Sequence, residues 1–168
     1  MEKIGFGGSC HWCTEAIFLS LKGVSGVQQG WIASEGEASS FSEGVIVAYN
    51  PDIIALNTLI AIHLYTHSCT SNHSMRSKYR SAVYTFNEEQ SEVSGNAIGS
   101  LQKEFTSPVI TQVLPCKDFK LNTEDFLNYY YSNPEKPFCE NIVNPKLKSL
   151  MAQFAGEVDL QKLKHLES

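Results

Sequence analysis

The chain has 168 residues, of which 42% are hydrophobic and 18% charged, which suits one compact domain with a sizeable core and excludes wholesale disorder. Its formal net charge of −5 argues against a general nucleic-acid binder, because such proteins need a basic surface that faces the phosphates. No apolar run approaches the ~20 residues of a membrane-spanning helix, and the first residues lack the apolar run of a secretory signal. We therefore expect a cytoplasmic protein that forms a single domain over residues 1–168.

The apolar pattern predicts strands and helices that alternate along the chain. We expect strands at 3–6, 24–32, 45–49, 80–86 and 109–114, helices at 10–22, 56–67, 87–105, 123–131 and 145–166, and polar loops at 33–42 and 67–78. Gly23 is a plausible C-cap of the first helix. This order predicts an α+β or α/β sandwich.

The five cysteines do not suggest a disulfide framework, because their number is odd and the chain is not of the small secreted type. They are Cys10, Cys13, Cys69, Cys116 and Cys139. In a reducing compartment such cysteines are catalytic, redox-active, metal-binding or buried, and their number alone does not choose among these roles.

The stretch around Cys10 carries the clearest chemistry. The pair Gly7-Gly8 allows a sharp turn after the first strand and a close approach of the backbone to a ligand. Cys10 then begins a helix, where free N–H groups and the helix dipole favour the thiolate, and His11 adds positive charge. Cys10 is therefore the best candidate nucleophile, although its Cys-x-x-Cys pairing with Cys13 is equally typical of two cysteines buried under a helix.

A zinc site is an alternative interpretation of the same residues. The ligand types that zinc accepts occur at Cys10, His11, Cys13, His63, His67, Cys69 and His73. No second Cys-x-x-Cys completes a paired knuckle, however, and two histidines four residues apart on one helical face are more typical of packing or solvation. We expect no metal.

Several segments, in the same order along the chain, resemble the A-type peptide methionine sulfoxide reductases. Residues 6–15 resemble the family signature, which runs phenylalanine, three glycines, cysteine, phenylalanine, tryptophan, cysteine, any residue and glutamate. Residues 43–51 resemble its glutamate-bearing strand, and residues 79–84 its tyrosine-arginine-serine-alanine strand. Residues 133–146 resemble its C-terminal pattern, so the resemblance extends over most of the chain.

The resemblance implies a fold and a reaction. The fold is α+β, a ferredoxin-like βαβ sandwich with a central mixed sheet, flanking helices and long loop extensions. The reaction is the thiol-dependent reduction of methionine S-sulfoxide, free or in peptides and proteins, to methionine. Cys10 would attack the sulfur and become a sulfenic acid, Glu43 would be the general acid, and Tyr79 would hydrogen-bond the sulfoxide oxygen. Trp12 would form one wall of an apolar box around the substrate methyl group.

A second thiol would then condense with the sulfenic acid, and a thioredoxin-type reductant would reduce the resulting disulfide. Cys139 falls where the family often carries this resolving cysteine, on a segment, residues 132–168, that we expect to be partly mobile and to end in a helix. The prolines around Cys139 would keep it out of a regular helix. Cys13 is the second candidate, although a helix would bury it one turn below Cys10. The other two cysteines match no family role and are expected to be structural.

The departures from the family pattern cluster in the substrate pocket. The box phenylalanine is replaced by His11, which makes an apolar wall titratable, and a tyrosine is replaced by Trp31, which removes a hydroxyl donor. Ser74 stands at the aspartate of the loop before Tyr79. Losing one hydrogen bond to the developing charge costs about 10²–10³ in rate. We expect His11, Trp12, Trp31 and Ser74 to bind substrate.

These departures leave a second function open, that of a catalytically weakened paralogue which senses redox state through the same thiol or acts on a different sulfoxide. No nucleotide or flavin motif occurs, so we expect no cofactor and expect the electrons to come through thiols. The expected partners are methionine sulfoxide in peptides or proteins and a thioredoxin-type reductant, with neither nucleic acid nor membrane.

Overall fold

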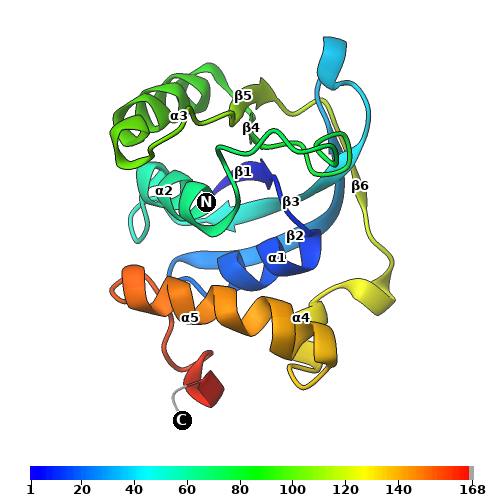
Figure 1. The fold of residues 1–168 in the computed structure, drawn as a ribbon, viewed down its shortest axis with the longest axis vertical. Helices are drawn as coiled ribbons and strands as arrows, with labels where there is room; N and C mark the ends of the chain where they lie inside the picture. The colour runs from blue at the N-terminus through cyan, green and yellow to red at the C-terminus, as the bar shows by residue number, and fades with distance from the viewer. Residues whose placement is uncertain (167–168) are drawn as a thin grey trace.

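The computed structural model describes residues 1–166, so the last two residues of the expected C-terminal segment 132–168 lie outside the described residues. They form a six-stranded sheet with helices packed against it (Figure 1). The strands are β1 (Glu2–Gly7), β2 (Val24–Ala33), β3 (Ser42–Tyr49), β4 (Ala82–Thr85), β5 (Gln112–Pro115) and β6 (Asp118–Leu121). The α-helices are α1 (His11–Leu19), α2 (Leu56–Thr66), α3 (Glu88–Leu101), α4 (Tyr129–Ser132) and α5 (Asn144–Gln153).

The strand order confirms the expected fold class. The sheet runs β5-β4-β1-β3-β2-β6, and within its central four strands each pair of neighbours is antiparallel. Their chain order β1-α1-β2-β3-α2-β4 is that of the ferredoxin-like fold. The crossover through α3 adds β5 parallel to β4, and β6 pairs antiparallel with the opposite edge at β2. The sheet is therefore mixed, with β1 and β3 at its centre.

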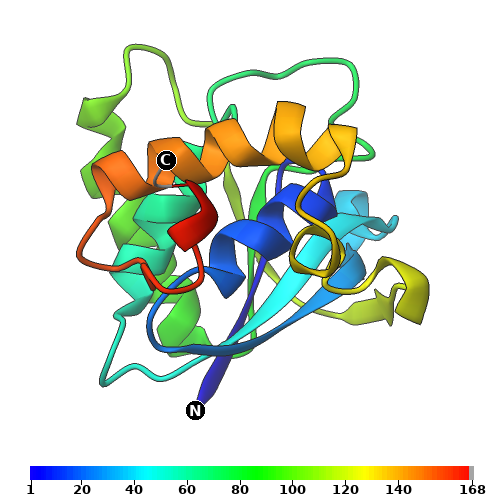
Figure 2. The ribbon, with the colours of Figure 1, turned by 90° about the horizontal axis from the view of Figure 1, so that it is seen from below.

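The helices cover one face of the sheet, and this face holds the larger core (Figure 2). Phe6 of β1 stacks on Phe18 of α1, with ring centroids 4.6 Å apart and planes 3° from parallel. On β3, Val45 and Val47 point into this core and are fully buried, whereas Ile46 packs on the opposite face with Tyr84. The predicted alternation along β3 is thus confirmed. Within residues 1–166, no helix has the length and apolar character needed to cross a membrane.

Three glycines in register bring the strands together beside the first helix. Gly7 of β1 lies opposite Gly44 of β3, which lies opposite Gly30 of β2. A Cβ atom added to Gly30 would lie 2.1 Å from the backbone oxygen of Lys120 in β6. Only glycine therefore allows β6 to pair at this point. The same row leads into the turn that carries Cys10.

The second half of the chain departs from several predicted elements. The four-residue edge strand β6 was missed, because its alternation is too short to stand out. The predicted helix at 123–131 is instead a 3₁₀ turn (Glu124–Phe126) followed by α4, and the left-handed Asn128 (φ 53°) separates the two. A residue with positive φ interrupts helical hydrogen bonding, so one continuous helix does not form.

The prediction of a helix over 145–166 was wrong beyond Gln153. The backbone leaves α5 there and turns back on α1, where Val158 forms a β-bridge with Leu21 and becomes fully buried. Tertiary packing of this side chain outweighs the local helical pattern.

The expectation that prolines keep Cys139 out of a regular helix was correct only in part. Cys139 begins a π-helical turn (Cys139–Val143) that runs directly into α5. Pro145 lies in the first turn of α5 and supplies no N–H to the carbonyls of the π-helical turn before it. The segment is thus helical, but its first turn is wider than an α-helical one.

Substitution of Gly30 tests the contact with β6. We expect Gly30→Ala to lower the free energy of unfolding by about 1–3 kcal/mol, because backbone rather than a flexible side chain meets the new methyl group. Urea unfolding monitored by circular dichroism measures this change. The matched control is Gly26→Ala on the same strand, where the added Cβ meets nothing within 4 Å. Equal effects of the two substitutions would contradict this account.

Candidate active site

Cys10 lies at the N-terminus of α1, in a turn fixed from two sides. Gly8 has a φ of +145°, and a Cβ atom there would lie 2.5 Å from the ring of His67. The His63 ring donates from Nε2 to the Gly7 carbonyl oxygen at 2.8 Å, and Arg76 donates to that of Gly8 at 2.9 Å. The backbone therefore has one course into α1, and Cys10 is its N-cap residue.

The surroundings of Cys10 favour its thiolate. The pKa of Cys10 is lowered chiefly by a hydrogen bond from the Cys13 thiol, and the backbone N–H groups of Trp12 and Cys13 contribute in the same direction. Partial burial and the Glu43 carboxylate act against this shift without reversing it. In return, the hydrogen bond to Cys10 and burial raise the pKa of Cys13, so Cys13 stays a thiol. The pair is thus one nucleophile and one proton donor.

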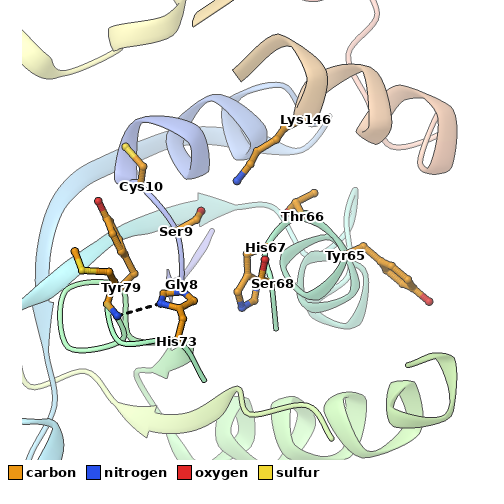
Figure 3. Close-up of a pocket in the computed structure, with 11 residues that line it drawn as sticks. Gly8, Ser9, Cys10, Tyr65, Thr66, His67, Ser68, His73, Tyr79 and Lys146 are labelled. Atoms are coloured by element: carbon orange, nitrogen blue, oxygen red, sulfur yellow. Dashed lines mark hydrogen bonds between the residues drawn. The ribbon is translucent and has the colours of Figure 1, made fainter. Parts of the chain in front are cut away.

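The Cys10 side chain opens into a cleft of about 580 Å³ (Figure 3). Tyr79 borders this cleft on the same side as Cys10, and Lys146 of α5 borders it from the helical layer. Other residues of the lining are His67, His73 and Met75. The structure therefore brings the predicted nucleophile and the predicted phenol to one cavity. Lys146 was not predicted, since nothing in its local pattern marks it.

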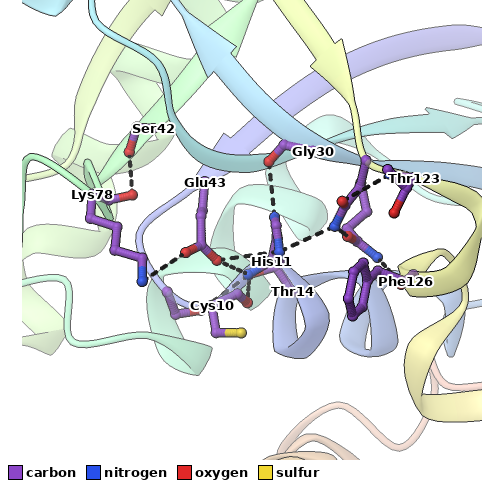
Figure 4. Close-up of polar contacts among 12 residues, drawn as sticks. Cys10, His11, Thr14, Gly30, Ser42, Glu43, Lys78, Thr123 and Phe126 are labelled. Atoms are coloured by element: carbon purple, nitrogen blue, oxygen red, sulfur yellow. Dashed lines mark hydrogen bonds and ion pairs between the residues drawn. The ribbon is translucent and has the colours of Figure 1, made fainter.

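Glu43 lies beside Cys10 and is only 6% exposed (Figure 4). Its Oε1 accepts the backbone N–H of His11 at 3.1 Å, and its Oε2 lies 3.6 Å from the ammonium group of Lys78. Lys78 also lies over the Tyr79 ring, 5.2 Å from its centroid, and its pKa is raised first by Tyr79 and then by Glu43. Lys78 therefore links the predicted acid with the predicted phenol, a role that the sequence did not reveal.

The four residues predicted to bind substrate occupy different places. His11 is 5% exposed and lies against Glu43, and Trp31 meets its ring edge-on with centroids 5.3 Å apart. Trp31 borders a separate shallow hollow with Phe41. Ser74 is exposed in a turn and does not line the cleft, although the residues on either side of it do.

Trp12 belongs to an aromatic cluster built by the C-terminal half of the chain. Its ring stacks on Tyr129 with centroids 4.1 Å apart and planes 7° from parallel, and it also contacts Phe126 and Phe138. Its indole N–H is buried without a hydrogen-bond partner among the described residues. The cluster attaches the segment after β6 to the first turn of α1.

Two of the histidines considered as zinc ligands, His63 and His67, instead pack against the turn at Gly7-Gly8. The rings of His63 and His67 stack with centroids 4.1 Å apart, and the Ser81 hydroxyl lies 2.8 Å from His67 Nε2. Burial lowers the pKa of His67 to about 4 and that of His63 well below its ordinary value, so both rings are neutral at pH 7. Within residues 1–166, no group of three His, Cys, Asp or Glu side chains is arranged to hold a metal ion.

The five cysteines are all free thiols. Cys139 is fully buried, which raises its pKa, and it lies close enough to Cys13 for its charge to raise the pKa of that thiol as well. Cys69 is buried, as expected, whereas Cys116 is half-buried on the opposite face of the sheet. The three thiols at 10, 13 and 139 therefore form one group, and the other two lie apart from it.

The chain is similar to known proteins over most of its length. Residues 2–158 match the family model described as peptide methionine sulfoxide reductase. A peptide methionine sulfoxide reductase MsrA of Trichodesmium erythraeum is 29% identical, over 94% of this chain and 98% of its own. The MsrA of Deinococcus radiodurans is 30% identical, over 93% of this chain and 83% of its own.

Solved structures share the fold. Mxr1 from Saccharomyces cerevisiae in its reduced form superposes with a TM-score of 0.73 at 21% identity, over 82% of this chain and 88% of its own. Methionine sulfoxide reductase A of Corynebacterium diphtheriae gives a TM-score of 0.64 at 21% identity, over 79% and 75% of the two chains. Mxr1 in complex with Trx2 gives 0.61 at 20% identity, over 74% and 81%.

The hydrogen bond from Cys13 predicts how the reactivity of Cys10 depends on pH. Because this bond lowers the pKa of Cys10, its removal in Cys13→Ala raises the pH at which alkylation by iodoacetamide reaches half its maximal rate. Mass spectrometry of the modified peptide measures the rate at Cys10. Cys13→Ser retains a donor and should shift the profile less, and Cys69→Ala should leave it unchanged. An unaltered profile in Cys13→Ala would show that the helix terminus alone activates Cys10.

Proposed function

The chain belongs to the peptide methionine sulfoxide reductase family, and on this premise we propose that it reduces methionine S-sulfoxide, free or in peptides and proteins, to methionine through Cys10. One observation carries the assignment of the site. A cysteine with a lowered pKa opens into a cleft that Tyr79 also borders, and the buried carboxyl of Glu43 lies beside it. A nucleophile, an oxygen-binding hydroxyl and an acid are the three groups that the reaction requires.

In the first step, the Cys10 thiolate attacks the electrophilic sulfur of the sulfoxide. The sulfoxide oxygen takes a proton from Glu43 and is held by the Tyr79 hydroxyl. The S–O bond of the substrate then breaks, and the oxygen ends on Cys10 as a sulfenic acid while methionine leaves. One oxygen atom and one proton are transferred, the substrate sulfur is reduced, and Cys10 is oxidised by two electrons.

In the second step, a thiol condenses with the sulfenic acid and releases water. We assign this reaction to Cys13, which its hydrogen bond to Cys10 and its place one helical turn away support. Cys139 then attacks the sulfur of Cys13, which forms the disulfide between 13 and 139 and returns Cys10 to the thiolate. The proximity of Cys139 to Cys13 supports this order, in which Cys139 remains a resolving cysteine.

A thioredoxin-type dithiol completes the cycle by reducing this disulfide to two thiols. We also propose a cytoplasmic location, which the odd number of cysteines supports, and a single catalytic domain over residues 1–168.

Single-turnover reduction tests the proposed function. Fully reduced protein, mixed with a peptide that contains methionine S-sulfoxide and given no recycling system, should yield one methionine per chain and lose two thiols. Cys10→Ser should yield none, because the hydroxyl is not ionised at neutral pH, whereas Cys116→Ser should match the wild type. Chromatography of the peptide and thiol titration give the two counts. Folded wild-type protein that oxidises at Cys10 but yields no methionine would favour the redox sensor instead.

Mapping of the disulfides after one turnover tests the order of the thiols. The wild type should carry the disulfide between 13 and 139, and Cys139→Ser should stop with Cys10 joined to Cys13. Cys13→Ser should retain a sulfenic acid on Cys10 that dimedone traps. If Cys13→Ser instead joins Cys10 to Cys139 at the wild-type rate, Cys139 resolves the sulfenic acid directly and Cys13 takes no part.

A further inference from the structure

The loop between α2 and β4 borders the cleft and carries the phenol of Tyr79 (Figure 3). Within this loop Arg76 is half-buried, and its guanidinium group donates to four backbone carbonyl oxygens. Nε donates to Ser71 at 2.8 Å, and Nη2 donates to Ser68 at 2.5 Å. Nη1 uses both of its hydrogens, one on Gly8 and one on Tyr79, each at 2.9 Å. Four of the five N–H groups of the guanidinium are therefore bound by backbone.

The two hydrogen bonds of Nη1 join the two sides of the cleft. Gly8 belongs to the turn that leads into Cys10, and Tyr79 carries the phenol assigned to the sulfoxide oxygen. Because a guanidinium is planar, the two hydrogens of Nη1 point in fixed directions and keep the two carbonyls at one separation. Within residues 1–166, no other side chain makes hydrogen bonds both to this loop and to residues 8–10.

The Gly8 end of this bridge is also held by other groups. The His63 ring donates to the preceding carbonyl at 2.8 Å, and the ring of His67 packs where a side chain of Gly8 would begin. The groups that shift the pKa of Cys10 lie in its own helical turn and at Glu43 in β3. We therefore expect the turn and the Cys10 thiol to keep their places without the guanidinium.

The Tyr79 end depends on Arg76 for one of its two attachments. The carbonyl of the preceding residue, Lys78, accepts the backbone N–H of Glu43 at 2.8 Å and the hydroxyl of Ser42 at 2.8 Å (Figure 4). The Tyr79 carbonyl follows, and its hydrogen-bond donor is Arg76. Strand β3 thus fixes Tyr79 relative to the acid, and Arg76 fixes it relative to the nucleophile.

We propose that Arg76 is a positioning residue, which holds the phenol of Tyr79 at the distance from Cys10 that the sulfoxide requires. The proposal rests on the function proposed above and adds no step to the reaction. The sulfur and oxygen of a sulfoxide share one bond, so a thiolate and a phenol reach both atoms only at one separation. Arg76 does not line the cleft and acts through the backbone, without touching the substrate.

A double-mutant cycle with Tyr79 tests this proposal. Arg76→Met keeps the apolar stem of the side chain and removes its donors. Its single-turnover rate at saturating substrate should fall about 10–100-fold, because misplacement of a reacting group by ~1 Å has that effect. Added to Tyr79→Phe, the same substitution should cost little more, because the phenol that Arg76 positions is already absent.

A merely structural role gives a different result in this cycle. The losses of Arg76→Met and Tyr79→Phe would then multiply, and that outcome, or a wild-type rate in Arg76→Met, would overturn the proposal. Lys162→Ala is the matched control, since it removes a cation that donates to the Leu19 carbonyl at 2.7 Å, at the far end of α1. It should keep the wild-type rate. Arg76→Gln, which is too short to reach both carbonyls, takes the place of Arg76→Met if that variant does not fold.

A signal that does not depend on turnover separates this proposal from the proposed function. In protein labelled with fluorotyrosine, the fluorine resonance absent from Tyr79→Phe belongs to Tyr79. In Arg76→Met it should broaden or split, because the ring loses its single position, whereas alkylation of Cys10 should keep its wild-type pH profile. An unchanged resonance would overturn the proposal even in an active enzyme. Folded protein that shows the change in Arg76→Met, but whose wild type yields no methionine, would instead overturn the proposed function.

Discussion

The site depends on one close contact, between the turn that follows β1 and His67, the residue at the C-terminal end of α2. Gly8 accepts a backbone conformation that other residues rarely adopt, and the ring of His67 fills the space where a side chain would begin. Two further side chains donate hydrogen bonds to the backbone carbonyls of this turn, His63 from α2 and Arg76 from the loop before β4. Because Cys10 follows within two residues, this packing sets its position at the helix terminus. There the Cys13 thiol, and to a lesser extent the backbone N–H groups of the first turn, lower the pKa of Cys10.

A second set of polar groups connects the sheet edge to the acid. Gln29, Asn122 and His11 form a buried chain that ends at Glu43, and Gln29 also donates to the carbonyl of Phe126 at 2.7 Å. Buried polar groups are costly unless each has a partner, so this chain holds β6 and the segment after it in one arrangement. The glycine row allows β6 to approach closely enough to take part. The pairing of β6 with β2 therefore also determines which groups surround the Glu43 carboxyl.

The sequence predicted what depends on local pattern and on order along the chain. The central strands, α1, α2 and the position of Cys10 follow from periodicity and from the glycine pair, and the roles of Glu43 and Tyr79 came from the family resemblance. It did not predict β6, the end of α5 or the contacts of Lys78 and Lys146, since each depends on residues distant in the chain. His11 was expected to bind substrate, whereas its ring is buried. This burial depends on contacts with separate strands that no local pattern relates, so the sequence did not reveal it.

The two tryptophans of the chain both touch the His11 ring, Trp12 at 5.8 Å and Trp31 at 5.3 Å between centroids. An imidazolium quenches indole fluorescence more strongly than a neutral imidazole, and sulfur in a neighbouring side chain quenches it too. All of the tryptophan emission of the protein thus originates within contact of the candidate site. The unlabelled chain consequently carries an optical signal of its own, which comes from the surroundings of the His11 ring.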